Sequence, residues 1–304
     1  MHDAFIFPGQ GSQYPGMGAD LFASSSFAQD FYKSANEILG FNLSEVSFHG
    51  PLETLSQTEY TQPSIFVHSV ILDQFLKEKQ LLPYAVAGHS LGEFSALVSA
   101  DILSFEDALN IVKVRSSEMA RIGRENEGTM AAIIGADSYQ LKKICNQDGI
   151  VVPANINAPG QVVISGERKA VDAAITTAKK IGVRRALPIN VSGAFHSPLM
   201  APVRVSLQES IDSMTFHNAK IPIFQNIHGK PVTNATEIKL NLLNQLENPV
   251  LWSPTILNMK KMGISNFIEV GPGKVLKGLN QRIFPECTTT QCDKFEHLDN
   301  LAVL

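Results

Sequence analysis

A serine set between two glycines is the residue of this sequence whose surroundings point most directly to chemistry. Residues 88–92 read Gly-His-Ser-Leu-Gly, and they follow a short apolar segment, residues 84–87, that is predicted as a strand. Residues 93–100 continue as a predicted helix. A serine at such a strand–turn–helix junction forms a nucleophile elbow, which lifts the Ser90 hydroxyl above the sheet. We predict a nucleophilic serine; the alternative is a chance match on an ordinary strand–helix turn.

The residues on either side of this serine support the same interpretation. Gly88 and Gly92 leave space for a sharp turn and for close packing of the helix on the strand. Leu91 begins the predicted helix, and the first N–H groups of a helix have no partner within it. The Leu91 backbone N–H can therefore donate to the oxyanion that forms when a serine attacks an acyl carbonyl.

A serine hydroxyl is a weak nucleophile until a base takes its proton. Among eight histidines, His196 has the most suitable context, in residues 192–198, Ser-Gly-Ala-Phe-His-Ser-Pro. Pro198 suits the first turn of a helix, and the chain order of serine before histidine is that of α/β-hydrolase-like enzymes. We predict His196 as the base; the alternative is a helix-capping or surface histidine. No carboxylate stands out as a third partner among the candidates Asp212, Glu247 and Glu269.

Composition and charge narrow the class of protein. The 304 residues are 44% hydrophobic and 18% charged, which is an ordinary balance for a globular chain. A net charge of −4 argues against a nucleic-acid partner, because such binders usually carry a strongly basic domain. No apolar run approaches the ~20 residues that span a bilayer, so no membrane partner is expected.

The cysteines and the N-terminal residues indicate the cellular compartment in which the protein is expected. Cys145, Cys287 and Cys292 have no metal-ligand partners at useful spacing, so no metal site is predicted. Their odd number indicates reduced thiols. The chain enters a predicted strand directly at residues 4–7, so we expect no leader and a cytoplasmic location.

The pattern of elements changes between residues 127 and 191. Strands are predicted at 129–134, 150–154, 161–165 and 184–189, with helices at 138–146 and 167–181. This βαββαβ order is that of the ferredoxin-like unit. We predict an α/β fold in which this small domain is inserted into a large α/β-hydrolase-like domain with a mostly parallel sheet. The predicted boundaries are 1–126 and 192–286 for the large domain, 127–191 for the small one, and 287–304 for a loose, polar C-terminal tail.

A glycine-rich loop follows the first predicted strand. Residues 8–13 read Pro-Gly-Gln-Gly-Ser-Gln, which offers a partial match to a dinucleotide-binding loop. That fingerprint needs a third glycine, and the position holds Tyr14. Dinucleotide binding is therefore not predicted.

Four motifs occur in an order that resembles one family. They are Phe-Pro-Gly-Gln-Gly-Ser-Gln at 7–13, Gly-His-Ser-Leu-Gly-Glu at 88–93, Gly-Ala-Phe-His-Ser at 193–197 and Glu-Val-Gly-Pro-Gly at 269–273. Together they resemble malonyl-CoA:acyl carrier protein transacylases of fatty-acid synthesis and the acyltransferase domains of polyketide synthases. The resemblance covers about residues 4–284, and the four linked motifs make it specific.

The resemblance implies a role for each matching residue of the catalytic centre. Ser90 becomes the acylated nucleophile and His196 its general base. The backbone N–H groups of Gln10 and Leu91 form the oxyanion hole. A backbone carbonyl, at the position of Gln245, orients the histidine in place of an acid.

The resemblance also implies a substrate site. Arg115, which on sequence alone is a surface charge, matches the arginine that pairs with the malonyl carboxylate, and a guanidinium suits that task through two parallel hydrogen bonds. Phe195 resembles the malonyl-type residue that crowds an α-methyl group. Met130 lines the acyl pocket or packs structurally. The residues placed along the CoA or phosphopantetheine channel are Asn155, Asn157 and Gln161.

The activity implied is a ping-pong transfer of malonyl from malonyl-CoA to the thiol of an acyl carrier protein. No metal or redox cofactor is implied, and the partners are the carrier protein and malonyl-CoA, with the enzyme a monomer. Two alternatives stay open at this point. A hydrolase could use the same Ser90 and His196 but has no use for a buried cation, and a carrier-binding module would need no intact Ser90, His196 and Gln10.

Overall fold

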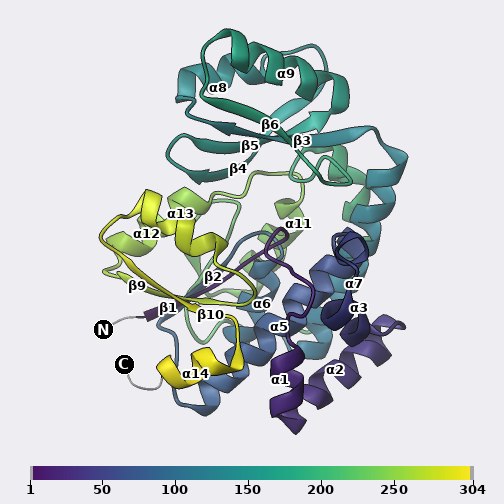
Figure 1. Cartoon of the computed structure of the whole chain (residues 1–304), viewed down its shortest axis with the longest axis vertical. Helices are drawn as coiled ribbons and strands as arrows, with labels where there is room; N and C mark the ends of the chain where they lie inside the picture. Colours follow the sequence, from purple (N-terminus) through teal and green to yellow (C-terminus); the bar gives the residue numbers. More distant parts are fainter. Residues whose placement is uncertain (1–2, 302–304) are drawn as a thin grey trace.

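Six strands form the sheet of the larger part of the molecule, in the order β10-β9-β1-β2-β7-β8 (Figure 1). The computed structural model describes residues 3–301. The strands are β1 (Asp3–Phe7), β2 (Ala85–Gly88), β7 (Ile223–Phe224), β8 (Pro231–Val232), β9 (Asn266–Val270) and β10 (Thr288–Cys292). Paired neighbours run parallel except β7 and β8. The predicted α/β class with a mainly parallel sheet is confirmed.

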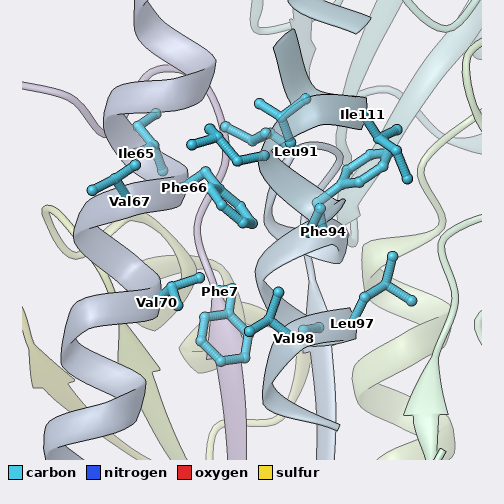
Figure 2. Close-up of a cluster of buried hydrophobic side chains, with 14 of the residues drawn as sticks. Phe7, Ile65, Phe66, Val67, Val70, Leu91, Phe94, Leu97, Val98 and Ile111 are labelled. Carbon is cyan, nitrogen blue, oxygen red and sulfur yellow. The ribbon is translucent and has the colours of Figure 1, made fainter. Parts of the chain in front are cut away.

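The side chains of β1 alternate between two helical layers, as the period of two in a strand requires. Phe5 and Phe7 pack in the core shared with α5 (Thr58–Glu78) and α6 (Gly92–Ser99). Ala4 and Ile6 pack in the core on the other face, with α12 (Trp252–Lys261) and α13 (Val275–Ile283). Figure 2 shows Phe7 between the apolar side chains of α5 and α6. Strand β2, which ends two residues before Ser90, is divided in the same way, with Val86 in the first core and Ala85 and Ala87 in the second.

A second sheet, with strand order β4-β5-β3-β6, lies at the other end of the molecule (Figure 1). Its antiparallel strands are β3 (Gly128–Ile134), β4 (Val151–Ala158), β5 (Gln161–Glu167) and β6 (Arg185–Ile189), and its helices are α8 (Ser138–Cys145) and α9 (Arg168–Lys180). This confirms the predicted βαββαβ order. One face packs on α8 and α9, while Met130 and Val163 on the other face join the core of the larger part. The boundaries of the small unit at 127 and 191 stay a prediction.

The remaining helices pack mainly on other helices, above all on α5 and α7 (Phe105–Glu125). They are α1 (Ala19–Ser24), α2 (Ser26–Leu39), α3 (Leu43–His49), α4 (Leu52–Leu55), α7 itself, the 3-10 helix η1 (Pro198–Val203), α10 (Arg204–Asp212), α11 (Ala235–Gln245) and α14 (Phe295–Leu301). The short helices α1, α3 and α4 were not predicted, because fewer than two turns give no clear periodicity. Within residues 3–301, no helix has the length and apolar character needed to cross a membrane.

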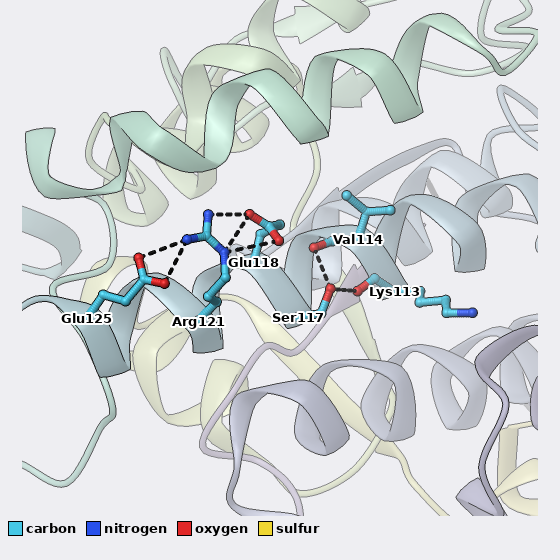
Figure 3. A network of polar contacts seen from close by, with 6 residues as sticks. All are labelled: Lys113, Val114, Ser117, Glu118, Arg121 and Glu125. Atoms are coloured by element: carbon cyan, nitrogen blue, oxygen red, sulfur yellow. Dashed lines mark hydrogen bonds and ion pairs between the residues drawn. The ribbon is translucent and has the colours of Figure 1, made fainter.

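Helix α7 connects the two sheets and presents different chemistry on its two faces. Ser104 caps its start by accepting a hydrogen bond from the Asp107 backbone N–H at 3.0 Å. On the outer face, Arg121 pairs with Glu118 at 2.7 Å and with Glu125 at 2.8 Å (Figure 3). On the inner face, Arg115 is only 1% exposed. The prediction from sequence alone of a surface charge at Arg115 is therefore wrong.

The C-terminal segment is part of the fold, so the loose tail predicted from residue 287 is wrong for residues 288–301. Strand β10 pairs with β9 along its length, from Thr288 to Cys292. Asp293, which follows it, accepts a hydrogen bond from the Tyr14 hydroxyl at 2.9 Å and lies 3.3 Å from the buried His68 ring. The strand was missed because Thr-Thr-Thr-Gln-Cys lies at the sheet edge and shows no apolar alternation. Residues 302–304 lie outside the described part of the chain.

The two sheets are joined by backbone contacts next to the cavity described below. The Val250 N–H donates to the Ala154 carbonyl at 2.8 Å, and the Ile156 N–H donates to the Val250 carbonyl at 2.8 Å. A Cβ on Gly123 would lie 2.1 Å from the Ser192 carbonyl oxygen, so the end of α7 lies directly against the returning chain. Strand β4 is therefore held in a defined place beside the larger part.

Candidate active site

Ser90 occupies a strained turn at the end of β2. Its φ of 54° lies in the left-handed region, which a non-glycine residue adopts only when the surroundings hold it there. Asn226 holds it: the Ser90 backbone N–H donates to Asn226 Oδ1 at 2.7 Å, and Asn226 Nδ2 donates to the Gly88 carbonyl at 2.6 Å. A Cβ on Gly88 would lie 1.9 Å from the carbonyl carbon of Gly92, so the turn requires a glycine there. The elbow geometry predicted from the motif is present.

His196 lies within hydrogen-bond distance of this serine. The Ser90 Oγ to His196 Nε2 distance is 2.8 Å. His196 Nδ1 lies 3.0 Å from the Gln245 carbonyl oxygen and 3.2 Å from the Asn248 carbonyl oxygen. Because a carbonyl only accepts, Nδ1 must carry the proton, and this leaves Nε2 free to accept from Ser90. The ring is therefore oriented by backbone carbonyls, with its basic nitrogen directed at the serine.

None of the three carboxylates considered from sequence reaches this histidine. Asp212 is exposed at the end of α10. Glu247 pairs with Arg204 at 3.1 Å. Glu269 is buried, and it accepts hydrogen bonds from the Leu276 and Lys277 backbone N–H groups, both at 2.8 Å, at the start of α13. The arrangement is a serine–histidine pair with carbonyl support.

Burial keeps the histidine neutral. His196 is 3% exposed, and burial, followed by the nearby Arg115 charge, lowers its pKa to about 3. At neutral pH the ring is therefore in its basic form. A histidine in this state can accept the serine proton as soon as an acyl group is in place.

Arg115 reaches the same serine from helix α7. Its Nη2 donates to Ser90 Oγ at 3.0 Å and to Gln245 Oε1 at 2.9 Å. Its Nη1 donates to Gln62 Oε1 at 2.5 Å. Since a guanidinium only donates, Ser90 Oγ accepts from Arg115 and directs its own hydrogen to His196. The arginine thus fixes which way the serine proton points.

The Arg115 charge is buried without a carboxylate in contact among the described residues. Its Nε has no hydrogen-bond partner within residues 3–301, and its guanidinium carbon lies 5.4 Å from the centre of the Phe94 ring. Burial lowers the Arg115 pKa to about 9, although Glu93 opposes this, so the side chain stays charged at neutral pH. A buried cation with a free N–H group is a site for an anionic ligand.

Two backbone N–H groups beside the serine are available as donors. Within the described chain, neither the Gln10 nor the Leu91 N–H has a hydrogen-bond partner. The loop carrying Gln10 approaches the elbow closely, since a Cβ on Gly9 would lie 2.3 Å from the His89 carbonyl oxygen. Gln10 Nε2 donates to Thr58 Oγ1 at 3.3 Å, which anchors the loop to α5.

A cavity of about 190 Å³ contains these groups. Its walls include Gln10, Ser90, Leu91, Arg115 and His196 from the larger part, together with residues of the smaller sheet. Five of the six predicted substrate residues line it: Arg115, Met130, Asn155, Asn157 and Phe195. His89 lines the same cavity, and its Nε2 lies 2.8 Å from Asn157 Oδ1. The cavity lies between the two sheets.

Gln161, predicted as a channel residue, does not line this cavity. It begins β5, and its side-chain oxygen accepts a hydrogen bond from Arg282 of α13. The Gln161 side-chain amide, which was expected to face the substrate, is therefore bound by Arg282. Gln161 acts in this structure as a contact between the smaller sheet and α13.

Sequence reasoning missed several residues of the site. Gln62 binds Arg115, Asn226 braces the elbow, and the buried Glu93 accepts from Asn226 and Gln245. Polar residues inside apolar helices were the available signal for Gln62 and Glu93. Asn226 lies after a two-residue strand and carries no such signal. Within residues 3–301 no group of three or more His, Cys, Asp or Glu could hold a metal ion.

Comparison with known proteins places the chain among acyl transferases. Residues 4–289 match the acyl transferase domain family. A Bacillus subtilis protein named malonyl CoA-acyl carrier protein transacylase is 41% identical over 284 residues, which cover 92% of this chain and 90% of that one.

Solved structures agree with the sequence match. An acyl carrier protein S-malonyltransferase from Vibrio cholerae has a TM-score of 0.94 and 37% identity, covering 99% of this chain and all of that one. A malonyl-transacylase solved in complex with its type II polyketide-synthase acyl carrier protein has a TM-score of 0.95 and 36% identity, covering 100% of this chain and 99% of that one.

The neutral state of His196 can be checked by titration. Because its pKa is lowered to about 3, we expect its ring proton resonances to stay constant between about pH 8 and pH 5, where an ordinary histidine titrates. NMR of the protein provides the measurement, with the His196→Gln variant to assign the signal. A midpoint near the ordinary value of about 6.5 contradicts the account.

Proposed function

The chain belongs to the malonyl-CoA:acyl carrier protein transacylase family of acyl transferases, and we propose that it moves a malonyl group from malonyl-CoA to the phosphopantetheine thiol of an acyl carrier protein. The names of its relatives support the substrate and the partner. The observation that carries the proposal is the position of Arg115, whose Nη2 lies 3.0 Å from Ser90 Oγ. An acid-ended acyl group on that oxygen lies next to a buried cation.

The first half-reaction acylates the serine. Ser90 Oγ attacks the thioester carbonyl carbon while its proton passes to His196 Nε2, 2.8 Å away. The carbonyl oxygen becomes an oxyanion that accepts from the Gln10 and Leu91 N–H groups. Each such donor is typically worth about 10²–10³ in rate. The oxyanion then collapses, the carbon–sulfur bond breaks, and His196 returns the proton to the CoA sulfur.

The second half-reaction runs in reverse with a new thiol. The carrier protein's phosphopantetheine sulfur attacks the malonyl-Ser90 carbonyl carbon and gives its proton to His196. Collapse breaks the bond to Ser90 Oγ, which takes the proton back. The carbonyl of Gln245, 3.0 Å from His196 Nδ1, stabilises the imidazolium at both stages. The reaction is therefore a ping-pong exchange through one ester.

Arg115 gives selectivity for malonyl. Arg115 lines the cavity beside Ser90, so its guanidinium can pair with the free carboxylate, whereas an acetyl group leaves the buried charge without an anion. Removing one partner of a buried ion pair typically costs about 3–5 kcal/mol. Phe195, 6% exposed beside His196, restricts the space next to the reacting carbon and disfavours an α-methyl group.

The smaller sheet provides the rest of the substrate channel. Asn155, Asn157 and Met130 face the cavity beside the serine, where they line the path of the pantetheine arm. No metal or redox cofactor is needed for either half-reaction. The monomeric state and the cytoplasmic location stay predictions.

Transfer of label distinguishes this function from its alternatives. On incubation with malonyl-CoA labelled in the malonyl group, we expect label on Ser90 that moves to added acyl carrier protein, and none on the Ser90→Ala variant. Autoradiography and peptide mapping locate the label. Label that leaves Ser90 only to water contradicts a transferase and indicates a hydrolase, and an absence of label indicates a non-catalytic carrier-binding module.

The role of Arg115 is tested by its removal. For Arg115→Ala we expect kcat/KM for malonyl-CoA to fall by about 10²–10³ or more. We expect kcat/KM for acetyl-CoA to fall much less, because that substrate loses only the contact that orients the Ser90 hydroxyl. Arg121→Ala is the matched control, because Arg121 lies on the same helix with its side chain outward. Steady-state kinetics with both thioesters provide the ratio. An Arg115→Ala enzyme that keeps its malonyl preference rules out this assignment.

A further inference from the structure

Glu93 closes the Gly-His-Ser-Leu-Gly-Glu motif, and neither half-reaction above uses it. It lies in the first turn of α6, one turn after Ser90, and is 1% exposed. Its carboxylate accepts from Gln225 Nε2 at 3.1 Å, the Asn226 backbone N–H at 2.9 Å and Gln245 Nε2 at 3.1 Å. These donors are neutral groups. A buried carboxylate held in this way needs an explanation, because its burial is costly.

Two of its three donors also contact the reacting residues. Asn226 accepts from the Ser90 N–H at 2.7 Å. Gln245 Nε2 donates to the Ser90 carbonyl at 3.1 Å as well as to Glu93. The Gln245 backbone carbonyl lies 3.0 Å from His196 Nδ1, and its side-chain oxygen accepts from Arg115 at 2.9 Å. Glu93 therefore binds the two residues whose hydrogen bonds hold Ser90, His196 and Arg115 in place.

The third donor, Gln225, connects Glu93 to helix α11. Gln225 Oε1 accepts from Asn241 Nδ2 at 2.7 Å. Asn241 lies one turn before Gln245, the last residue of α11. The carboxylate thus holds both the Gln245 side chain and the helix that ends at its carbonyl.

The orientation of the Gln245 amide follows from what surrounds it. An ionised carboxylate only accepts hydrogen bonds and a guanidinium only donates them. Gln245 must therefore turn its NH₂ group to Glu93 and its oxygen to Arg115, as the distances show. If the amide turned over, donors would face one another at Arg115, and the arginine would lose the acceptor that holds Nη2 beside Ser90.

The two charges are linked through this amide. Burial raises the Glu93 pKa, while its hydrogen bonds and the Arg115 charge oppose the rise. Burial lowers the Arg115 pKa, and Glu93 opposes that change. Each group therefore favours the charged state of the other, although no direct ion pair joins them. Because the Gln245 side-chain amide lies between Glu93 and Arg115, the guanidinium stays free to pair with a carboxylate from the substrate.

We propose that Glu93 is a positioning residue for malonyl selectivity: through the Gln245 side-chain amide, it holds the Arg115 guanidinium beside Ser90 while leaving it open to the substrate's carboxylate. The proposal rests on the proposed function, in which Arg115 binds the malonyl carboxylate. It differs from a purely structural role because it predicts a change in substrate preference.

Glu93→Gln tests this proposal. It keeps the shape of the side chain, but its NH₂ group faces the N–H donors that bind the Glu93 carboxylate. We expect kcat/KM for malonyl-CoA to fall about 10–100-fold, mainly through a higher KM. We expect a smaller fall for acetyl-CoA, which uses Ser90 and His196 but does not need the open guanidinium. Glu93→Asp, which keeps an acceptor-only carboxylate, should retain more of the malonyl preference. The measurement is the malonyl-to-acetyl ratio of kcat/KM for each variant.

Asp73→Asn is the matched control. Asp73 is another fully buried carboxylate, and it binds the far end of α6 by accepting from Ser99 Oγ at 2.6 Å. It also forms an ion pair at 3.0 Å with Lys77 of its own helix, α5. It does not line the cavity. We expect Asp73→Asn to lower the unfolding temperature without changing the malonyl-to-acetyl ratio.

A second variant keeps the test valid if Glu93→Gln does not fold. Gln245→Leu removes the linking amide but keeps the backbone carbonyl beside His196, and it should lose malonyl preference to a similar extent. If Arg115→Ala loses the preference while Glu93→Gln and Gln245→Leu both keep it, the role of Glu93 is overturned and the proposed function stands. If Arg115→Ala itself keeps the preference, the proposed function fails, and the role of Glu93 fails with it.

Discussion

A positive charge buried beside the nucleophile is the constraint on which the rest of this site depends. Arg115 is held by the neutral acceptors Gln62 and Gln245 and by Ser90 itself, and no carboxylate of the described chain contacts it. A contacting acid would have neutralised the charge and closed the site. Placing Glu93 on the far side of an amide keeps the guanidinium charged and still leaves it open to an acid from outside. The same guanidinium donates to Ser90 Oγ, which lies 2.8 Å from His196 Nε2, so in the proposed reaction one group serves both substrate recognition and proton transfer.

The fold brings these groups together from segments far apart in the chain. Strand β2 ends in the strained Ser90, helix α7 presents Arg115, and the loop before η1 presents His196. The end of α11 then contacts all three through Gln245. Strand β4 of the smaller sheet closes the cavity, fixed by its backbone bonds to Val250. The groups that the proposed reaction uses as oxyanion donors, base and cation therefore already lie around Ser90 in this structure, and such preorganisation is the main source of electrostatic catalysis.

Much of this arrangement was accessible from the sequence, and the exceptions have physical causes. The elbow and the βαββαβ order depend on local patterns of glycine and apolar residues, so they could be predicted. The role of Arg115 came only through family resemblance, because an arginine on an amphipathic helix is more often exposed. Asn226 and the edge strand β10 gave no local signal, since their places are set by partners distant in the chain. Gln161 does not line the cavity, and its contact with Arg282, on a helix distant in the chain, could not be predicted from local sequence.

The most direct measurement of the central claim is a crystal structure of the enzyme trapped after reaction with malonyl-CoA. The account predicts a malonyl ester on Ser90 Oγ, its carbonyl oxygen within hydrogen-bond distance of the Gln10 and Leu91 N–H groups, and its free carboxylate on the Arg115 guanidinium. The Gln245 amide should keep its oxygen toward the arginine. An ester whose carboxylate turns away from Arg115 into solvent would contradict the account.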